Sequence, residues 1–197
     1  MKVLVVGASG RLGTAAANAL AERHEVIRAS RSGDVEVDLI DTASIQNMFE
    51  KVGKVDAVVA CTGSVPFKPM ADLSEEDFKR GIQDKVLGQV NLVRLGVPYL
   101  NDAGSLTLTT GVLAREPINT GIVASLANGA LESFVMAVAA ELPRGLRINA
   151  VSPSVLEEAT NYHDYFPGFS RIPAEIVGQA YVKSVDGIQT GRIFSLG

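Results

Sequence analysis

The first twenty residues constrain the fold most, because they join an apolar run to a helix through three glycines. Lys2–Ala21 reads KVLVVGASGRLGTAAANALA. Val3–Val6 is short, uncharged and rich in β-branched residues, which is typical of a strand buried on both faces. The Ala-rich segment after the turn favours helix. Gly7, Gly10 and Gly13 allow a tight turn with a bare backbone, so the first N–H groups of the helix are free to bind an anion. The stretch therefore predicts a dinucleotide site.

The size and charge of the chain exclude several classes of protein. With 197 residues, 47% hydrophobic and 20% charged residues, the sequence fits one globular domain, residues 1–197, with a sizeable core. Its net charge is −4 and no basic run exceeds two residues, which argues against a nucleic-acid or membrane partner. Cys61 is the only cysteine, so a disulfide framework and a cysteine metal cluster are excluded, and we expect no metal. We find no signal peptide and no apolar run of transmembrane length, and therefore expect a cytoplasmic protein.

Strand and helix patterns alternate along the whole chain. Strands are expected at 3–6, 24–29, 35–39, 56–60, 105–109, 147–151 and 191–195. Helices are expected from the glycine turn to about residue 23, then at 42–52, 74–97, 121–142 and 173–184. Ser74 is the expected N-cap of the third helix, and Asp41 or Thr42 that of the second. This alternation predicts an α/β fold, a doubly wound, seven-stranded parallel sheet with helices on both faces (a Rossmann fold).

The residues that follow each strand define the site, because the ligand of such a sheet lies beyond the carboxyl ends of the strands. After the second strand, where an NAD site carries a carboxylate, this chain has Ser30, Arg31 and Ser32. An arginine and two hydroxyls suit a 2′-phosphate, since guanidinium binds phosphate through a fork of donors. We therefore favour NADP(H) over NAD(H), with Arg11 as a second cation. The alternatives are that both arginines are solvated and that Asp34 supplies the acid.

Several motifs resemble the short-chain dehydrogenase/reductase family over nearly the whole chain. They are the glycine turn, Asp38, Cys61-Thr62-Gly63 (the family has Asn-Ala-Gly), Leu146–Pro153 and Thr190-Gly191. The resemblance implies that the protein uses NAD(P)(H) to interconvert carbonyls and alcohols. It also implies that Asp38 contacts the adenine and that Pro153 lies beside the nicotinamide. Family members act on the substrate oxygen with a Ser and a Tyr-x-x-x-Lys pair.

That catalytic pair is missing. Ala130–Phe134 matches the segment after the family's Lys, which puts Asn128 at the Lys position and Ala124 at the Tyr position. No Tyr-x-x-x-Lys occurs anywhere in the chain. Thr110 stands at the position of the family's Ser and keeps a hydroxyl. Losing a positioned acid costs about 10²–10⁴ in rate, but hydride transfer belongs to the cofactor, so a rerouted activity remains open.

Lys85 is the substitute candidate. At about 100° per residue, the helix expected at 74–97 has an apolar face formed by Phe78, Ile82, Val86, Leu92 and Val93. Lys85 falls inside this face, beside Gln89, and stands where the family often has the Asn of its proton relay. We predict that it donates to the substrate oxygen or to the nicotinamide ribose. The alternative is a lysine that snorkels to water. Tyr162, His163 and Tyr165 are weaker candidates, since such loop residues more often pack a lid.

The sequence thus predicts an NADP(H)-dependent oxidoreductase of the short-chain type that acts on a small carbonyl or alcohol, with Thr110 and Lys85 in an atypical active site. The alternative is a non-catalytic NADP(H)-binding protein, either a redox sensor or a partner subunit. The resemblance implies a homodimer or homotetramer through the two long helices, the second of which is smooth at Ala124, Ala127, Gly129 and Ala130. The predicted cofactor-binding residues are Gly7, Ser9, Gly10, Arg11, Leu12, Gly13, Ser30, Arg31, Ser32, Asp38, Leu39, Cys61, Thr62, Gly63, Lys85 and Pro153.

Overall fold

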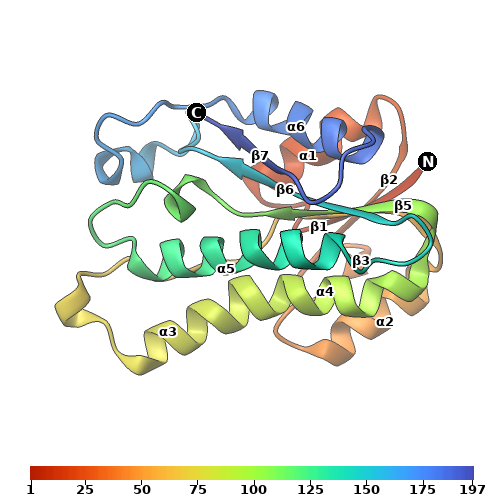
Figure 1. Cartoon of the computed structure of the whole chain (residues 1–197), viewed down its shortest axis with the longest axis horizontal. Helices are drawn as coiled ribbons and strands as arrows, with labels where there is room; N and C mark the ends of the chain where they lie inside the picture. The colour runs from red at the N-terminus through yellow and green to blue at the C-terminus, as the bar shows by residue number, and fades with distance from the viewer.

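Seven parallel strands form one sheet in the order β3-β2-β1-β4-β5-β6-β7, in a computed structural model that describes all of residues 1–197 (Figure 1). The strands are β1 Lys2–Val6, β2 Glu25–Ser30, β3 Val35–Glu36, β4 Val55–Ala60, β5 Leu100–Thr109, β6 Arg147–Pro153 and β7 Ile193–Leu196. The order reverses after β3, where the chain crosses from one half of the sheet to the other. The predicted fold class is confirmed.

Two layers of helices cover the sheet (Figure 1). One face carries α1 Arg11–Ala21 and α6 Ala174–Asp186; the other carries α2 Thr42–Val52, α3 Glu75–Gly81, α4 Gly88–Gly96 and α5 Ile122–Ala139. Alternate residues of β1 pack against the two helix layers, because successive side chains of a strand point to opposite faces. Leu4 and Val6 belong to the core under α2, α4 and α5, and Val3 and Val5 to the core under α1 and α6.

Two helix starts depend on side-chain caps. The Asp41 carboxylate accepts from the Ala43 N–H, which identifies Asp41 and not Thr42 as the N-cap of α2. Ser74 and Asp77 form a reciprocal capping box at α3. The Lys68 ammonium also binds Asp77, at 2.7 Å. These donors, with Lys68 first, hold the pKa of the Asp77 carboxyl well below its usual value and tie the loop after β4 to α3.

The helix expected at 74–97 is interrupted by a π-helical segment, Ile82–Leu87, between α3 and α4. The fully buried Gln89 side chain supports it: Nε2 donates to the carbonyl oxygens of Lys85 (3.3 Å) and Thr109 (3.0 Å). Gln89 Oε1 accepts from the Thr109 N–H at 2.9 Å. One amide therefore joins the π-helical segment to the end of β5. Such segments frequently mark functional sites.

Three further expectations need correction. β3 has two residues, where alternation predicted five, because only Ala29 and Ser30 of β2 pair with it. β5 begins at Leu100, five residues before the expected start. α5 is long and apolar enough, by length and composition alone, to cross a membrane, which the sequence analysis missed. In this fold it packs Val123, Ala127, Leu131 and Val135 into the core.

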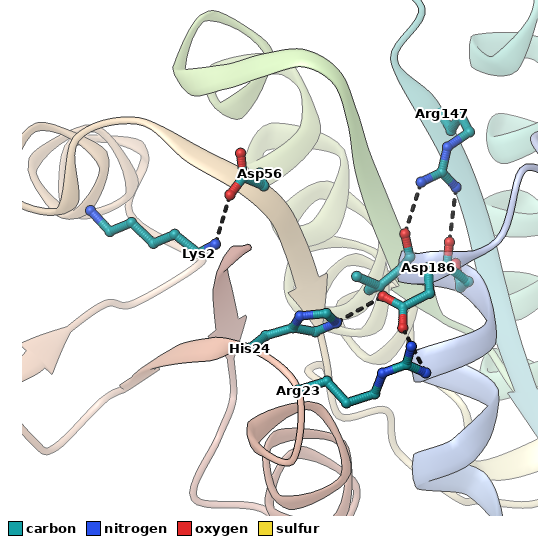
Figure 2. Close-up of polar contacts among 8 residues, drawn as sticks. Lys2, Arg23, His24, Asp56, Arg147 and Asp186 are labelled. Carbon is teal, nitrogen blue, oxygen red and sulfur yellow. Dashed lines mark hydrogen bonds and ion pairs between the residues drawn. The ribbon is translucent and has the colours of Figure 1, made fainter.

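Polar contacts fasten the amino-terminal edge of the sheet, as Figure 2 shows. Asp56 accepts from the Asn101 side chain and from the backbone N–H of Lys2, and both hydrogen bonds lower its pKa. Asp186, at the end of α6, binds His24 at 2.7 Å and Arg23 at 3.3 Å. The opposite, carboxyl-terminal edge carries the cavities described next.

Candidate functional site

The glycine turn brings backbone close to backbone at the carboxyl end of β1. Gly7 has φ +82°, and a Cβ there would meet the carbonyl oxygen of Cys61. A Cβ on Gly13 would overlap the Gly7 carbonyl, so Gly13 allows α1 to pack against the turn. Gly10 is the N-cap of α1 and has no side chain with which to bind the first N–H groups of the helix. This geometry suits an anion at the helix start.

A cavity of about 320 Å³ opens beside this turn. Its lining includes Gly7, Ser9, Gly10, Ser30, Arg31, Asp38, Leu39, Cys61, Thr62 and Gly63. Arg31 is exposed at the rim, and the Asp38 carboxylate accepts from the Ile40 N–H. The Thr62 hydroxyl is buried without a protein partner. The cavity therefore offers a cation, a carboxylate and an unpaired hydroxyl beside a bare backbone, and these groups fit a dinucleotide with a 2′-phosphate.

Some predicted residues lie elsewhere. Arg11 lines a groove between α1 and α6, together with Glu158, so the structure does not place it beside Arg31. Ser32 and Asp34 are exposed and do not line the cavity; the Ser32 carbonyl accepts from the Ser30 hydroxyl within the turn after β2. Burial raises the pKa of the Cys61 thiol to about 12, so Cys61 acts as a small packed group.

A second cavity of about 290 Å³ adjoins the first and shares Gly63 and Ser64 with it. Most of its lining is apolar and includes Leu12, Val65, Phe67, Val112, Leu113, Ala124, Pro153, Leu156, Tyr162 and Phe166. Five short or charged polar side chains line it as well: Ser64, Lys85, Thr110, Asn128 and Ser154. An apolar cavity with few polar groups is typical of a small-molecule site.

Two of these polar side chains are buried and unpartnered. Asn128 is 4% exposed and its Oδ1 has no hydrogen bond; Ser154 is 5% exposed and its Oγ has none. Buried polar atoms are normally paired, so such atoms beside a cavity point to a ligand. Ala124, at the position where the family has Tyr, lines the same cavity without a polar atom.

Lys85 reaches this cavity from the π-helical segment. Gly63 has φ +101°, and a Cβ there would lie 2.7 Å from the Lys85 Cα, so glycine lets the two backbones meet. Burial lowers the pKa of Lys85 to about 8, and the neighbouring Asp84 opposes this shift. Asp84 itself accepts from the Ser64 N–H and hydroxyl. A lysine with this pKa can exchange a proton near neutral pH.

Thr110 is held by two residues that the sequence analysis missed. Its hydroxyl lies 3.0 Å from Glu132 Oε1 of α5. The same oxygen binds Arg115 Nη1 at 2.6 Å and Ser152 Oγ at 3.1 Å, and Arg115 Nη2 donates to Ser152 at 3.0 Å. Glu132 follows Asn128 by one helical turn, so its spacing places it on the same face of α5. Nothing in the sequence near Arg115 indicates that contact.

The aromatic loop after β6 closes one side of the second cavity. Tyr162 lines it, and Phe67 lies with its ring centroid 6.0 Å from Tyr162 and 6.3 Å from Tyr165. The His163 ring nitrogen is 3.0 Å from the Leu156 carbonyl oxygen, within the loop. Tyr165 and His163 do not line the cavity. Their contacts are those of a packed lid.

Comparison with known proteins gives three kinds of match. The sequence profile of a family described as "Enoyl-(Acyl carrier protein) reductase" matches residues 1–189. An uncharacterized oxidoreductase from Methylorubrum extorquens is 27% identical over 184 residues, which cover 80% of this chain and 74% of that protein. Matches to three further curated relatives span only 52% to 63% of their length.

Two solved structures are similar over almost the whole chain. The Listeria innocua protein lin1944 is 49% identical, with a TM-score of 0.97 over 99% of this chain and 98% of that one. A small-chain dehydrogenase in complex with NADPH is 25% identical, with a TM-score of 0.88 over 99% of this chain and 95% of that one.

Proposed function

Because this chain belongs to the short-chain dehydrogenase/reductase family, we propose that it is a cytoplasmic, NADP(H)-dependent oxidoreductase that acts on a small carbonyl or alcohol. One observation carries the proposal. The two adjoining cavities at the carboxyl edge of the sheet meet at Gly63 and Ser64; Arg31 lines one of them, and Lys85 and Thr110 line the other. This arrangement suits a dinucleotide whose nicotinamide end reaches a small apolar substrate site.

The residues of the chain divide the work. The first N–H groups of α1 would hold the pyrophosphate of the dinucleotide, and Arg31 would hold its 2′-phosphate. When bound, the reduced cofactor would give a hydride to a carbonyl, and the oxidised cofactor would accept a hydride from an alcohol. Thr110 orients the substrate oxygen and Lys85 exchanges its proton, in place of the missing Tyr and Lys. The apolar lining excludes water from this end of the site.

A comparison of binding with turnover tests this proposal against its rival, a protein that binds NADP(H) without chemistry. The purified chain is first titrated with NADPH and NADH, and NADPH is then followed at 340 nm with a broad carbonyl panel. Saturable NADPH binding with carbonyl-dependent oxidation is the expected result. Binding without oxidation across the panel would instead support a redox sensor or partner subunit, and absence of binding to either nucleotide would overturn both.

A further inference from the structure

The Glu132 carboxylate fixes which way the Thr110 hydroxyl points. Glu132 is mostly buried, with 14% of its side chain exposed, and forms an ion pair with Arg115. An ionised carboxylate can only accept hydrogen bonds, so the hydroxyl of Thr110 must donate to it. Ser152, which is fully buried, also donates to Glu132 and in turn accepts from Arg115, so both of its polar roles are filled.

The Thr110 hydroxyl has a single proton, and this contact uses it. Its lone pairs remain, so Thr110 can offer the adjoining cavity an acceptor and no donor. To accept a hydrogen bond from Thr110, a ligand carbonyl would have to replace Glu132 as the acceptor of the hydroxyl proton. Hydrogen bonds to a charged acceptor are roughly twice as strong as those between neutral groups, and a mostly buried carboxylate that loses a donor is left less satisfied. The competition therefore favours Glu132.

We propose that Glu132 and Arg115 are positioning residues that make Thr110 a hydrogen-bond acceptor, so that this cavity selects ligands that present a hydroxyl. The unpartnered Asn128 Oδ1 adds a second acceptor to the same lining. Of the substrates in the proposed function, an alcohol can donate to Thr110, whereas a carbonyl is held through Lys85 without a hydrogen bond from Thr110. This inference rests on the proposed function for one point only, that the substrate binds at this cavity; the direction of the Thr110 hydroxyl does not depend on it.

The proton itself can be located without any ligand. Neutron diffraction from crystals of the perdeuterated protein is expected to show the Thr110 deuterium on the line from Oγ1 to Glu132 Oε1. A deuterium on Thr110 that points into the cavity would overturn the inference. This result is independent of the cofactor. If the chain fails to bind NADPH but the Thr110 deuterium points to Glu132, the proposed function is refuted and the assignment of Thr110 as an acceptor stands.

A pair of matched probes tests the selectivity. p-Cresol has a hydroxyl where 4-methylanisole has a methyl ether, and neither is a substrate for hydride transfer. Their dissociation constants are measured from the NMR shift of the Thr110 methyl group with NADP⁺ present. We expect the wild type to prefer p-cresol about tenfold, which corresponds to one hydrogen bond.

Two variants show whether Glu132 and Arg115 position the Thr110 hydroxyl or only pack beside it. Glu132→Gln retains an acceptor oxygen without the charge, so the preference should lie between that of the wild type and that of the double variant. The double variant Glu132→Leu/Arg115→Leu removes the charge pair together and frees the Thr110 hydroxyl, so the preference should fall to about twofold or less. An unchanged preference in the double variant would overturn the inference. If neither probe shifts the Thr110 methyl group of the wild type, selection of a hydroxyl is refuted for this cavity and only the deuterium assignment remains.

Discussion

Arg31 is the basic side chain that lines the cavity after β2. An Arg–phosphate pair is a charge-assisted, often bidentate contact. Arg31→Asp should therefore weaken NADPH by about 10- to 100-fold while leaving NADH unchanged or improved, because a carboxylate at this place suits ribose hydroxyls. Isothermal titration with both nucleotides measures the two affinities. Equal losses for NADPH and NADH would show that Arg31 does not read the 2′-phosphate.

Arg11→Asp is the matched control for that substitution. It makes the same change of charge in the groove between α1 and α6, outside the cavity that Arg31 lines. We expect a smaller loss that is similar for NADPH and NADH, since Arg11 lies near the glycine turn common to both. A selective loss of NADPH in this variant would restore Arg11 to the 2′-phosphate site that the sequence analysis assigned to it.

Lys85 has a proposed role in proton exchange, and its burial also lowers the free energy of unfolding at neutral pH. Its pKa is about 8 in the fold, below the usual 10.5, because burial disfavours the charged form. The unfolded chain therefore binds more protons between these values, so the free energy of unfolding rises as pH increases from about 8 to about 10.5. Lys85→Met should remove this rise and stabilise the protein at pH 7 by about 1–3 kcal/mol.

The same substitution tests the role in catalysis. If Lys85 supplies the proton for carbonyl reduction, kcat/KM of the wild type falls above pH 8 and Lys85→Met loses about 10²–10⁴ in rate. Urea unfolding at pH 7 and pH 10.5, run beside the pH–rate profile, measures both effects. A variant that is more stable and equally active would identify Lys85 as a lysine that only snorkels to water.

At the scale of elements, Gln89 joins α4, the π-helical segment and β5. Its fully buried amide satisfies the N–H and carbonyl of Thr109 and the carbonyl of Lys85. Gln89→Leu keeps a similar volume but leaves these groups unpaired, so we expect a loss of about 2–4 kcal/mol in the free energy of unfolding. Chemical denaturation measures it. Gln83→Leu, nearby in the π-helical segment and without side-chain bonds, is the control and should change stability by less than about 1 kcal/mol.

The sequence predicted these elements better than it predicted their junctions. The buried run of β1 and the glycines after it define strand, turn and helix locally, so that prediction was confirmed. A helix with a constant 100° per residue places Lys85 and Gln89 on its apolar face. That assumption cannot predict the π-helical segment in which Lys85 lies beside the cavity. That segment depends on an amide bonded to β5, which no local pattern records. The Thr110–Glu132–Arg115 contact is long-range for the same reason.

At the scale of the whole molecule, the outer face of α5 is an exposed surface beside α3 and the π-helical segment, which α5 contacts. The sequence predicts a smooth contact surface on this helix at Ala124, Ala127, Gly129 and Ala130. The structure buries Ala124 and Ala127 in the core, so these two cannot face a partner, whereas Gly129 is half-buried and Ala130 is exposed. The outer face of α5 also carries apolar side chains: Ile122, Leu126 and Met136 are 37%, 48% and 56% exposed, and Leu87, at the end of the π-helical segment, is 40% exposed. A patch of this kind marks an interaction site, and we propose that a second copy of this chain covers it.

Leu126→Asp tests that interface. A charge at the centre of an apolar contact leaves a buried, unpaired carboxylate in the dimer, so the dissociation constant should rise by at least about 100-fold and the variant should sediment as a monomer. The control is Ile188→Asp, a change at a 94% exposed side chain in the loop between α6 and β7, which should leave the wild-type assembly intact. Sedimentation velocity over a concentration series measures all three proteins. A monomeric wild type, or a Leu126→Asp variant that assembles like the control, would show that the outer face of α5 does not join two copies of the chain.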